Sequence, residues 1–123
     1  MKRTESRELA FKTIYSKFFN PTNEDIFEGS TKENLEFVKD ILSNFATHYT
    51  EINDLISSNL KNYTLDRLNK IDLAIIIVAV IELKYIKQNP KEVIINEAVE
   101  LAKKYSTDKS PKFINGLLAD LVK

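Results

Sequence analysis

The chain has 123 residues, of which 43% are hydrophobic and 29% are charged, and it contains no cysteine. This length allows one domain with its own core, and the composition is that of a folded chain rather than a disordered one. The absence of cysteine excludes a disulfide framework and thiol chemistry. The longest apolar run, Leu73–Ile81, is too short for a membrane span, and no signal peptide is recognisable, so we expect a soluble cytoplasmic protein.

The formal net charge is zero, but the charged residues are unevenly distributed. Residues 1–20 and residues 101–123 each carry five basic and two acidic side chains, a net +3, whereas residues 21–60 carry two basic and eight acidic side chains, a net −6. If the two ends meet in space, they form a basic surface on a dipolar molecule. Scattered, solvated charge is the alternative.

Helical periodicity runs through nearly the whole chain. The first helix is expected over residues 5–19 and the second over residues 30–49, where Ser30 and Glu33 have the spacing of a capping box. Thr50 is expected to cap a short helix that follows. No stretch alternates apolar and polar residues as a half-buried strand would.

The second half of the chain continues the helical pattern. Thr64 is expected to cap a shorter turn, and residues 70–87 are apolar nearly all round, which is typical of a central buried helix. Asn96 is expected to cap the next helix, and Ser110 with Pro111 has the pattern of a last helix start. The sequence therefore predicts an all-α fold, a compact bundle of six to seven helices.

A search for catalytic groups finds no convergent set. His48 is the single histidine and has no cysteine to join it in a metal or nucleophile site. Asp72 and Glu82 flank the apolar helix, and nothing in their spacing brings them together. No glycine-rich phosphate loop is present, so an enzyme is the less favoured class and no cofactor is expected.

The two basic ends offer more chemistry. On the first helix, Arg3 and Arg7 fall on the same stripe as the core-facing residues, so they extend that stripe beyond the core. One interpretation is a pair of guanidinium groups directed at phosphates or bases, and the other is two arginines in solvent at a helix end.

The last helix contains Asn115 and Gly116, although glycine costs a helix about 1 kcal/mol relative to alanine. Lys112 and Gly116 fall on the outer face, and Phe113 lies on the shoulder of the apolar stripe. Such a surface suits a stacked base and a closely approaching backbone. The alternative is that Phe113 belongs to the core and Gly116 admits a neighbouring helix.

Three segments together resemble the family of the bacterial transcription antitermination factor NusB in their order and spacing, and the N-terminal segment resembles the first helix of that family. The three segments are Ile71–Leu83, Pro90–Tyr105 and Lys112–Leu118, and the N-terminal segment is Arg7–Tyr15. The resemblance covers nearly the whole chain. It implies a non-catalytic protein of two perpendicular helical sub-bundles, with residues 1–123 as a single RNA-binding domain.

The resemblance also implies partners. A member of this family pairs with NusE, a small-subunit ribosomal protein, binds the single-stranded boxA element of nascent ribosomal transcripts, and acts with other Nus factors and, indirectly, with RNA polymerase. Carried over by position, the NusE side includes Tyr15 and Asp72. The RNA side comprises Arg3, Arg7, Lys109, Lys112, Phe113, Asn115 and Gly116.

The chain departs from the family pattern at several positions. Glu5 and Glu8 interrupt the N-terminal basic cluster, and Lys109 is expected to supply part of the missing charge. Ile77 stands where the family often has an arginine. The sequence does not decide whether the protein forms a homodimer. Two alternative functions also remain: a helical protein–protein adaptor that does not bind RNA, and a stand-alone relative of the N-terminal domain of RNA cytosine methyltransferases.

Overall fold

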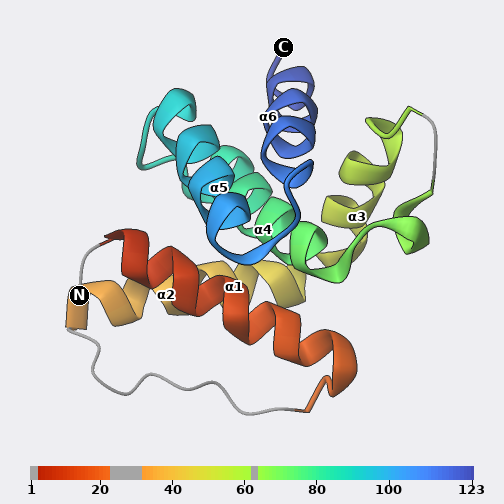
Figure 1. Cartoon of the computed structure of the whole chain (residues 1–123). Helices are drawn as coiled ribbons and strands as arrows, with labels where there is room; N and C mark the ends of the chain where they lie inside the picture. Colours follow the sequence, from red (N-terminus) through yellow and green to blue (C-terminus); the bar gives the residue numbers. More distant parts are fainter. Residues whose placement is uncertain (1–2, 23–31, 62–63) are drawn as a thin grey trace.

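The computed structural model describes residues 3–22, 32–61 and 64–123, and all regular structure in these ranges is helical (Figure 1). The predicted all-α bundle is confirmed. The α-helices are α1 (Arg3–Phe19), α2 (Lys32–Thr47), α3 (Tyr49–Ser58), α4 (Lys70–Ile81), α5 (Lys91–Tyr105) and α6 (Ser110–Leu121). A 3₁₀ turn, η1 (Leu65–Arg67), precedes α4, and a π-helical turn, η2 (Glu82–Ile86), follows it.

Helix α4 is the centre of the fold, as its apolar sequence predicts. Every residue from Asp72 to Ile81 is buried. Asn69 caps the helix, because its side-chain oxygen accepts a hydrogen bond of 2.8 Å from the backbone N–H of Ile71. Ile77, where the family often has an arginine, is 1% exposed and belongs to the same core.

The apolar segment is not one regular α-helix to residue 87. At Glu82 it changes to the π-helical turn η2, in which the N–H of Lys87 donates to the carbonyl of Glu82 at 2.8 Å. Lys87 then adopts a left-handed conformation with φ of 56°, which ends the helix. Glu82, the first residue of this turn, lies in the interior, where its side chain is 1% exposed.

Three expected helix caps are wrong. Helix α3 already begins at Tyr49, so Thr50 lies inside it, and α5 begins after Pro90, so Asn96 lies inside α5. Helix α6 has Lys109 rather than Ser110 at its N-cap position. In each case the helix begins earlier than the capping residue type suggested.

Two other cap predictions have different outcomes. Thr64 does occupy the N-cap position of η1, but its hydroxyl donates to the Asp66 carboxylate instead of accepting from the backbone. The Ser30 and Glu33 capping box lies outside the side chains that the structure describes.

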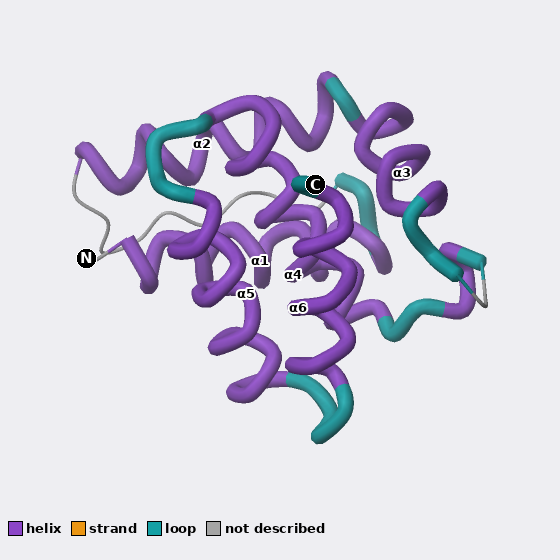
Figure 2. The backbone as a smooth tube through the Cα atoms, turned by 90° about the horizontal axis from the view of Figure 1, so that it is seen from above, coloured by secondary structure: helices purple, strands orange, loops and turns teal. Residues whose placement is uncertain are grey.

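The packing of the helices decides whether the first and the last helix can form one binding surface. Helix α1 packs on α2 and α4, whereas α6 packs on α5 and α4. Helices α4 and α5 therefore lie between the first and the last helix (Figure 1), and α3 lies on the side of the molecule away from α5 (Figure 2). Among the described residues, no helix combines the length and apolar character that crossing a bilayer requires.

Candidate functional site

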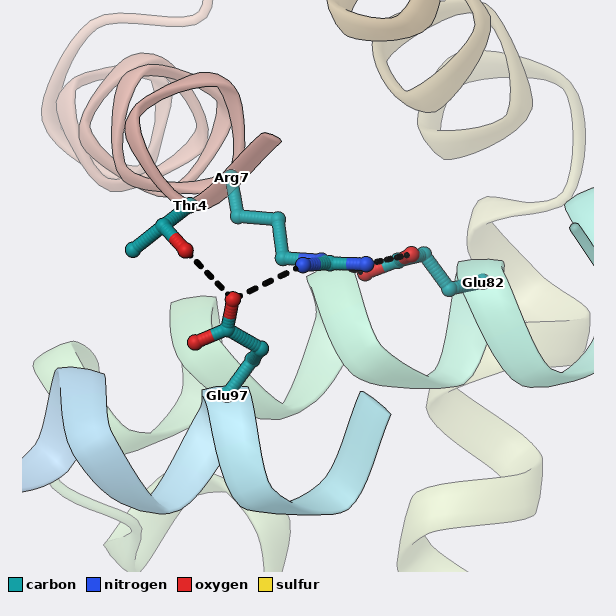
Figure 3. Close-up of polar contacts among 4 residues, drawn as sticks. All are labelled: Thr4, Arg7, Glu82 and Glu97. Atoms are coloured by element: carbon teal, nitrogen blue, oxygen red, sulfur yellow. Dashed lines mark hydrogen bonds and ion pairs between the residues drawn. The ribbon is translucent and has the colours of Figure 1, made fainter. Parts of the chain in front are cut away.

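Arg7 lies in the interior between α1, η2 and α5. Its side chain is nearly fully buried, and it makes two parallel hydrogen bonds to the Glu82 carboxylate, of 2.6 Å from Nε and 2.9 Å from Nη2. Its Nη1 donates to Glu97 at 3.0 Å, and the Thr4 hydroxyl donates to the same Glu97 oxygen at 2.5 Å. Figure 3 shows the guanidinium reaching from α1 to both carboxylates. This two-pronged geometry suits arginine and not lysine.

In this structure Arg7 is not presented to RNA, because its side chain is nearly fully buried and paired with Glu82, so the geometry does not support the expected RNA contact. The stripe analysis placed Arg7 correctly on the inward face of α1, but the interior there is polar because η2 and α5 each contribute a carboxylate. A buried arginine held by two glutamates is not accessible to a phosphate in this conformation. The sequence signal for this arrangement was Glu82, an acid at the end of an apolar run with no partner on its own helix.

Arg3 lies half-buried one turn before Arg7. Its guanidinium carbon lies 4.0 Å from the centre of the Phe37 ring on α2, a cation–π contact. The N-terminal arginines thus help to hold α1 on α2 and η2. Of the two arginines, Arg7 is buried and Arg3 is half-buried, while Lys12 on the same helix is exposed.

Tyr15 belongs to a row of aromatic rings along α1. It lies 6.4 Å from Phe11 and 5.1 Å from Phe19, and Phe11 lies 5.3 Å from Tyr105 on α5, all measured between ring centres. The row ends at the surface, because Phe19 is 66% exposed. A half-buried tyrosine beside a largely exposed phenylalanine is a suitable anchor for a protein partner.

Glu8 joins the same row to α5. Its carboxylate accepts hydrogen bonds from the Tyr105 hydroxyl and from Lys104, at 3.0 Å for the latter, and pairs with Lys12 at 3.4 Å. Burial raises the pKa of Glu8, but the hydrogen bonds from Tyr105, Lys104 and Lys12 outweigh that effect and hold its pKa below the ordinary value. Lys104 therefore pairs with Glu8 across the two helices, while Glu100 pairs with Lys103 at 3.2 Å.

Asp72, expected to contact a partner, is buried in this structure, so the geometry does not support that contact. The residue is 6% exposed, and one carboxylate oxygen accepts from Ser106 at 2.5 Å while the other accepts from Ser110 at 2.9 Å. Asp72 thus ties the start of α4 to the connection between α5 and α6. The hydrogen bond from Ser110 to Asp72 also explains why the Ser110 hydroxyl does not cap a helix.

His48 is structural as well. Its ring stacks on Tyr85 of η2 with centres 4.0 Å apart and planes inclined by 6°. Glu51 pairs with His48 Nδ1 and accepts from the Tyr85 hydroxyl, both at 3.2 Å. Among the described residues, no group of three or more histidine, cysteine, aspartate or glutamate side chains could hold a metal ion.

Most of the other residues predicted to bind RNA lie on the first turns of α6 or directly before it. Lys109, Lys112, Asn115 and Gly116 are exposed, and Phe113 is half-buried and packs against the core at the edge of this face. The apolar stripe on the opposite face consists of Ile114, Leu117, Leu118 and Leu121, as expected. We call the face formed by Lys109, Lys112, Phe113, Asn115 and Gly116 the α6 face.

Gly116 has open space around it. A Cβ atom added at this position has no neighbouring heavy atom within 4 Å. The alternative that Gly116 admits a neighbouring helix is therefore wrong within the chain. The bare backbone faces solvent, where a ligand can approach it closely.

A test of this geometry is the stability of Gly116→Ala. Because nothing surrounds the added methyl group and alanine favours a helix, we expect the free energy of unfolding to increase by about 0.5–1 kcal/mol. Urea denaturation of the two proteins measures the difference. A destabilised Gly116→Ala protein would show that the glycine serves packing after all.

The two basic ends do not form one compact surface as the charge pattern suggested. Arg7 is inside the molecule, and α4 and α5 separate α1 from α6. The residues that the fold does bring together are those of the α6 face, which contribute two lysines, an aromatic edge and an exposed glycine.

The fold and this face can be compared with known proteins. The sequence model described as the NusB family matches residues 4–123. The chain belongs to the NusB family. It is 42% identical to the "Transcription antitermination protein NusB" of Finegoldia magna, with all of this chain and 95% of that protein aligned. The protein of the same name in Listeria innocua is 37% identical, with 98% and 96% aligned.

Solved structures agree with the family assignment. A structure of T. maritima NusB superposes with a TM-score of 0.92 at 30% identity, covering 98% of this chain and 90% of that one. A crystal structure of the antitermination factors NusB and NusE in complex with double-stranded RNA has a TM-score of 0.86 at 27% identity, covering 98% and 97%. The NusB-like fold is thus confirmed.

Proposed function

We propose that this chain is a transcription antitermination factor that binds boxA-type RNA of nascent ribosomal transcripts together with NusE, in the cytoplasm, with residues 1–123 as one RNA-binding domain. Other Nus factors and RNA polymerase are reached indirectly through that complex. The proposal rests on the family match over residues 4–123 and on relatives that are named as antitermination proteins, not as enzymes. A NusB of the same fold has been crystallised with NusE and RNA.

The observation that carries the RNA part is the α6 face. Lys109 and Lys112 attract phosphates, Phe113 offers a ring edge, and the open backbone at Gly116 allows a sugar or a base to approach. Because Arg7 is occupied inside the protein, this face contributes most of the RNA-binding charge in our proposal. RNA affinity of the chain alone is then low, and NusE supplies the remainder.

We propose that NusE binds to the outer part of the aromatic row, which consists of Tyr15 and Phe19. Asp72 is not part of this proposed surface. The ring of Phe19 is largely exposed and would be covered by a partner, and Tyr15 positions it through a T-shaped contact. A binding assay with Phe19→Ser tests this surface without touching the core.

The RNA proposal predicts the behaviour of two variants. Gly116→Leu fills the open space with a side chain, so it should weaken RNA binding while the melting temperature stays the same or rises. Phe113→Ala should cost about 1–3 kcal/mol of binding free energy, which is typical of one stacked base. Fluorescence anisotropy with a boxA-like RNA and the NusE heterodimer measures both effects.

The matched control is Lys91→Ala, an exposed lysine at the start of α5 and outside the α6 face. Phe113 also contacts the core, so its affinity is compared at temperatures where thermal melts show a folded protein. Normal RNA binding by Gly116→Leu would refute the role of the α6 face. A helical adaptor without RNA would show no salt-dependent RNA retention at all.

A further inference from the structure

A cluster of polar side chains joins the beginning of α4 to the beginning of α6. Both oxygens of the Asp72 carboxylate are used, one for Ser106 at 2.5 Å and the other for Ser110 at 2.9 Å. Asn69 Nδ2 lies 3.4 Å from the Ser106 hydroxyl, and the Thr107 hydroxyl lies 2.8 Å from that of Ser110. We call these five residues the Asp72 cluster.

The number of available hydrogens fixes the direction of the hydrogen bonds in this cluster. The hydroxyls of Ser106 and Ser110 each carry one hydrogen, and an ionised carboxylate can only accept, so both hydrogens are directed at Asp72. Thr107 must then donate to Ser110, and the 2.9 Å contact between the two serine oxygens is left without a hydrogen. Asn69 donates to Ser106 through Nδ2, while its Oδ1 accepts from the backbone at the start of α4. Each donor is therefore oriented, directly or through a serine, toward one carboxylate.

The centre of the Asp72 cluster lies inside the protein. Asp72 is 6% exposed and Ser110 is 3% exposed. A carboxylate also repels phosphate groups, so Asp72 is not suited to bind RNA directly. The first turn of α4 favours an anion there, because the positive end of the helix dipole lies at that turn. An effect of Asp72 on RNA binding must therefore pass through the residues that it holds.

Ser110 is the first residue of α6, and the α6 face begins beside it. Lys109 directly precedes Ser110, while Lys112 and Phe113 follow within the first turn. The apolar stripe of α6 packs this helix on α5 and α4, but burial of apolar surface has no preferred direction, whereas a hydrogen bond does. The hydrogen bond from Ser110 thus restricts how α6 is rotated about its axis and shifted along it.

We propose that the Asp72 cluster is a positioning element for RNA binding, which holds the first turn of α6 so that Lys109, Lys112 and Phe113 contact RNA together. The inference rests on the proposed RNA binding by the α6 face, and it adds residues that do not touch the RNA. Side chains that are oriented before RNA arrives lose less conformational entropy on binding. NusE binding does not depend on the cluster, because the proposed aromatic NusE surface lies on α1.

The test removes both serine hydroxyls in the double variant Ser106→Ala and Ser110→Ala, and it uses the NusE heterodimer with a boxA-like RNA. At a temperature where melts show a folded protein, we expect fluorescence anisotropy to show RNA binding on the order of tenfold weaker than that of the parent protein. The affinity for NusE should be unchanged. Ser106→Thr keeps the hydroxyl at a residue with extended backbone, which suits a β-branched side chain, so this variant should bind RNA like the parent.

A matched control separates positioning from a general loss of stability. Ile56→Val lowers the stability of the protein by removing one buried methyl group from α3. Helix α3 lies away from α5 and contributes no residue to the Asp72 cluster or the α6 face (Figure 2). At the same temperature, this variant should bind RNA like the parent. Equal weakening by Ile56→Val and by the double serine variant would overturn the proposal.

A double-mutant cycle tests whether the serines act through the α6 face. Adding Phe113→Ala to the double serine variant should reduce RNA affinity by a smaller factor than Phe113→Ala does in the parent, because a displaced ring has less contact to lose. Equal factors in both backgrounds would refute a positioning role that acts through Phe113.

The same titrations distinguish failure of this inference from failure of the proposed function. If Gly116→Leu weakens RNA binding and the double serine variant does not, the α6 face binds RNA without the Asp72 cluster, and only this inference is overturned. If the parent heterodimer shows no salt-dependent RNA binding, the proposed function is refuted and this inference with it.

Discussion

Replacing Arg7 by alanine is expected to lower the free energy of unfolding by about 3–5 kcal/mol, the largest effect of any single change that we predict. The substitution leaves Glu82 in the interior, 1% exposed, without the guanidinium that now pairs with both of its oxygens. A carboxylate in that position must either stay charged without a partner or take up a proton, and both are costly. Chemical denaturation followed by circular dichroism measures the loss.

The control for this prediction is the double variant Arg7→Met and Glu82→Met. It removes both charges and fills the same space with apolar side chains, so it should be much more stable than Arg7→Ala. If Arg7→Ala instead costs less than about 1 kcal/mol and lowers the salt dependence of RNA binding, Arg7 is a phosphate contact and its place in the interior is refuted.

Asp72→Lys is expected to destabilise the protein by several kcal/mol, on the order of 3 or more. The change removes a carboxylate that accepts hydrogen bonds from Ser106 and Ser110, and it places a cation where both hydroxyls and the start of α4 favour an anion. Thermal melts measure the effect. A surface contact would have given the opposite result, a normal melting temperature with weaker NusE binding.

The variant Asp72→Asn removes the negative charge of the side chain but keeps its size and shape. The amide keeps one acceptor oxygen, so it should retain one of the two serine contacts and lose less stability than Asp72→Lys. Binding of NusE to Asp72→Asn at a temperature where the variant is folded should equal that of the parent protein. Weakened binding by a fully folded Asp72→Asn would restore Asp72 to the partner surface.

The candidate RNA-binding site that we propose could be predicted only in part from the sequence. The residues of the α6 face were identified because they are local: Lys112, Phe113 and Gly116 lie on one helix, and helical periodicity alone places them relative to its apolar stripe. The burial of Arg7 and Asp72 was not predicted, because their hydrogen-bond partners are distant in sequence. These partners are Glu82 and Glu97 for Arg7, and Ser106 and Ser110 for Asp72.

For the helices, too, local features could be predicted from the sequence and features that involve distant residues could not. The apolar run of α4 was sufficient to predict a central buried helix, since no other arrangement hides so continuous an apolar surface. The π-helical turn at Glu82 was not predicted. Residues within it contact distant parts of the chain, Glu82 with Arg7 and Tyr85 with His48, and such contacts cannot be read from the local pattern. Thr50 and Asn96 are residue types that often cap helices, but both helices begin before them, at Tyr49 and at Lys91.

The sequence by itself determined the all-α class, the buried centre at α4 and the outward face of α6, because each of these follows from the order of apolar and polar residues within one helix. Only the tertiary structure decided which charged side chains are available for binding. Burial and pairing depend on what the neighbouring helices contribute. Here η2 and α5 each contribute a carboxylate that holds Arg7 in the interior, whereas Lys109 and Lys112 of the α6 face stay exposed.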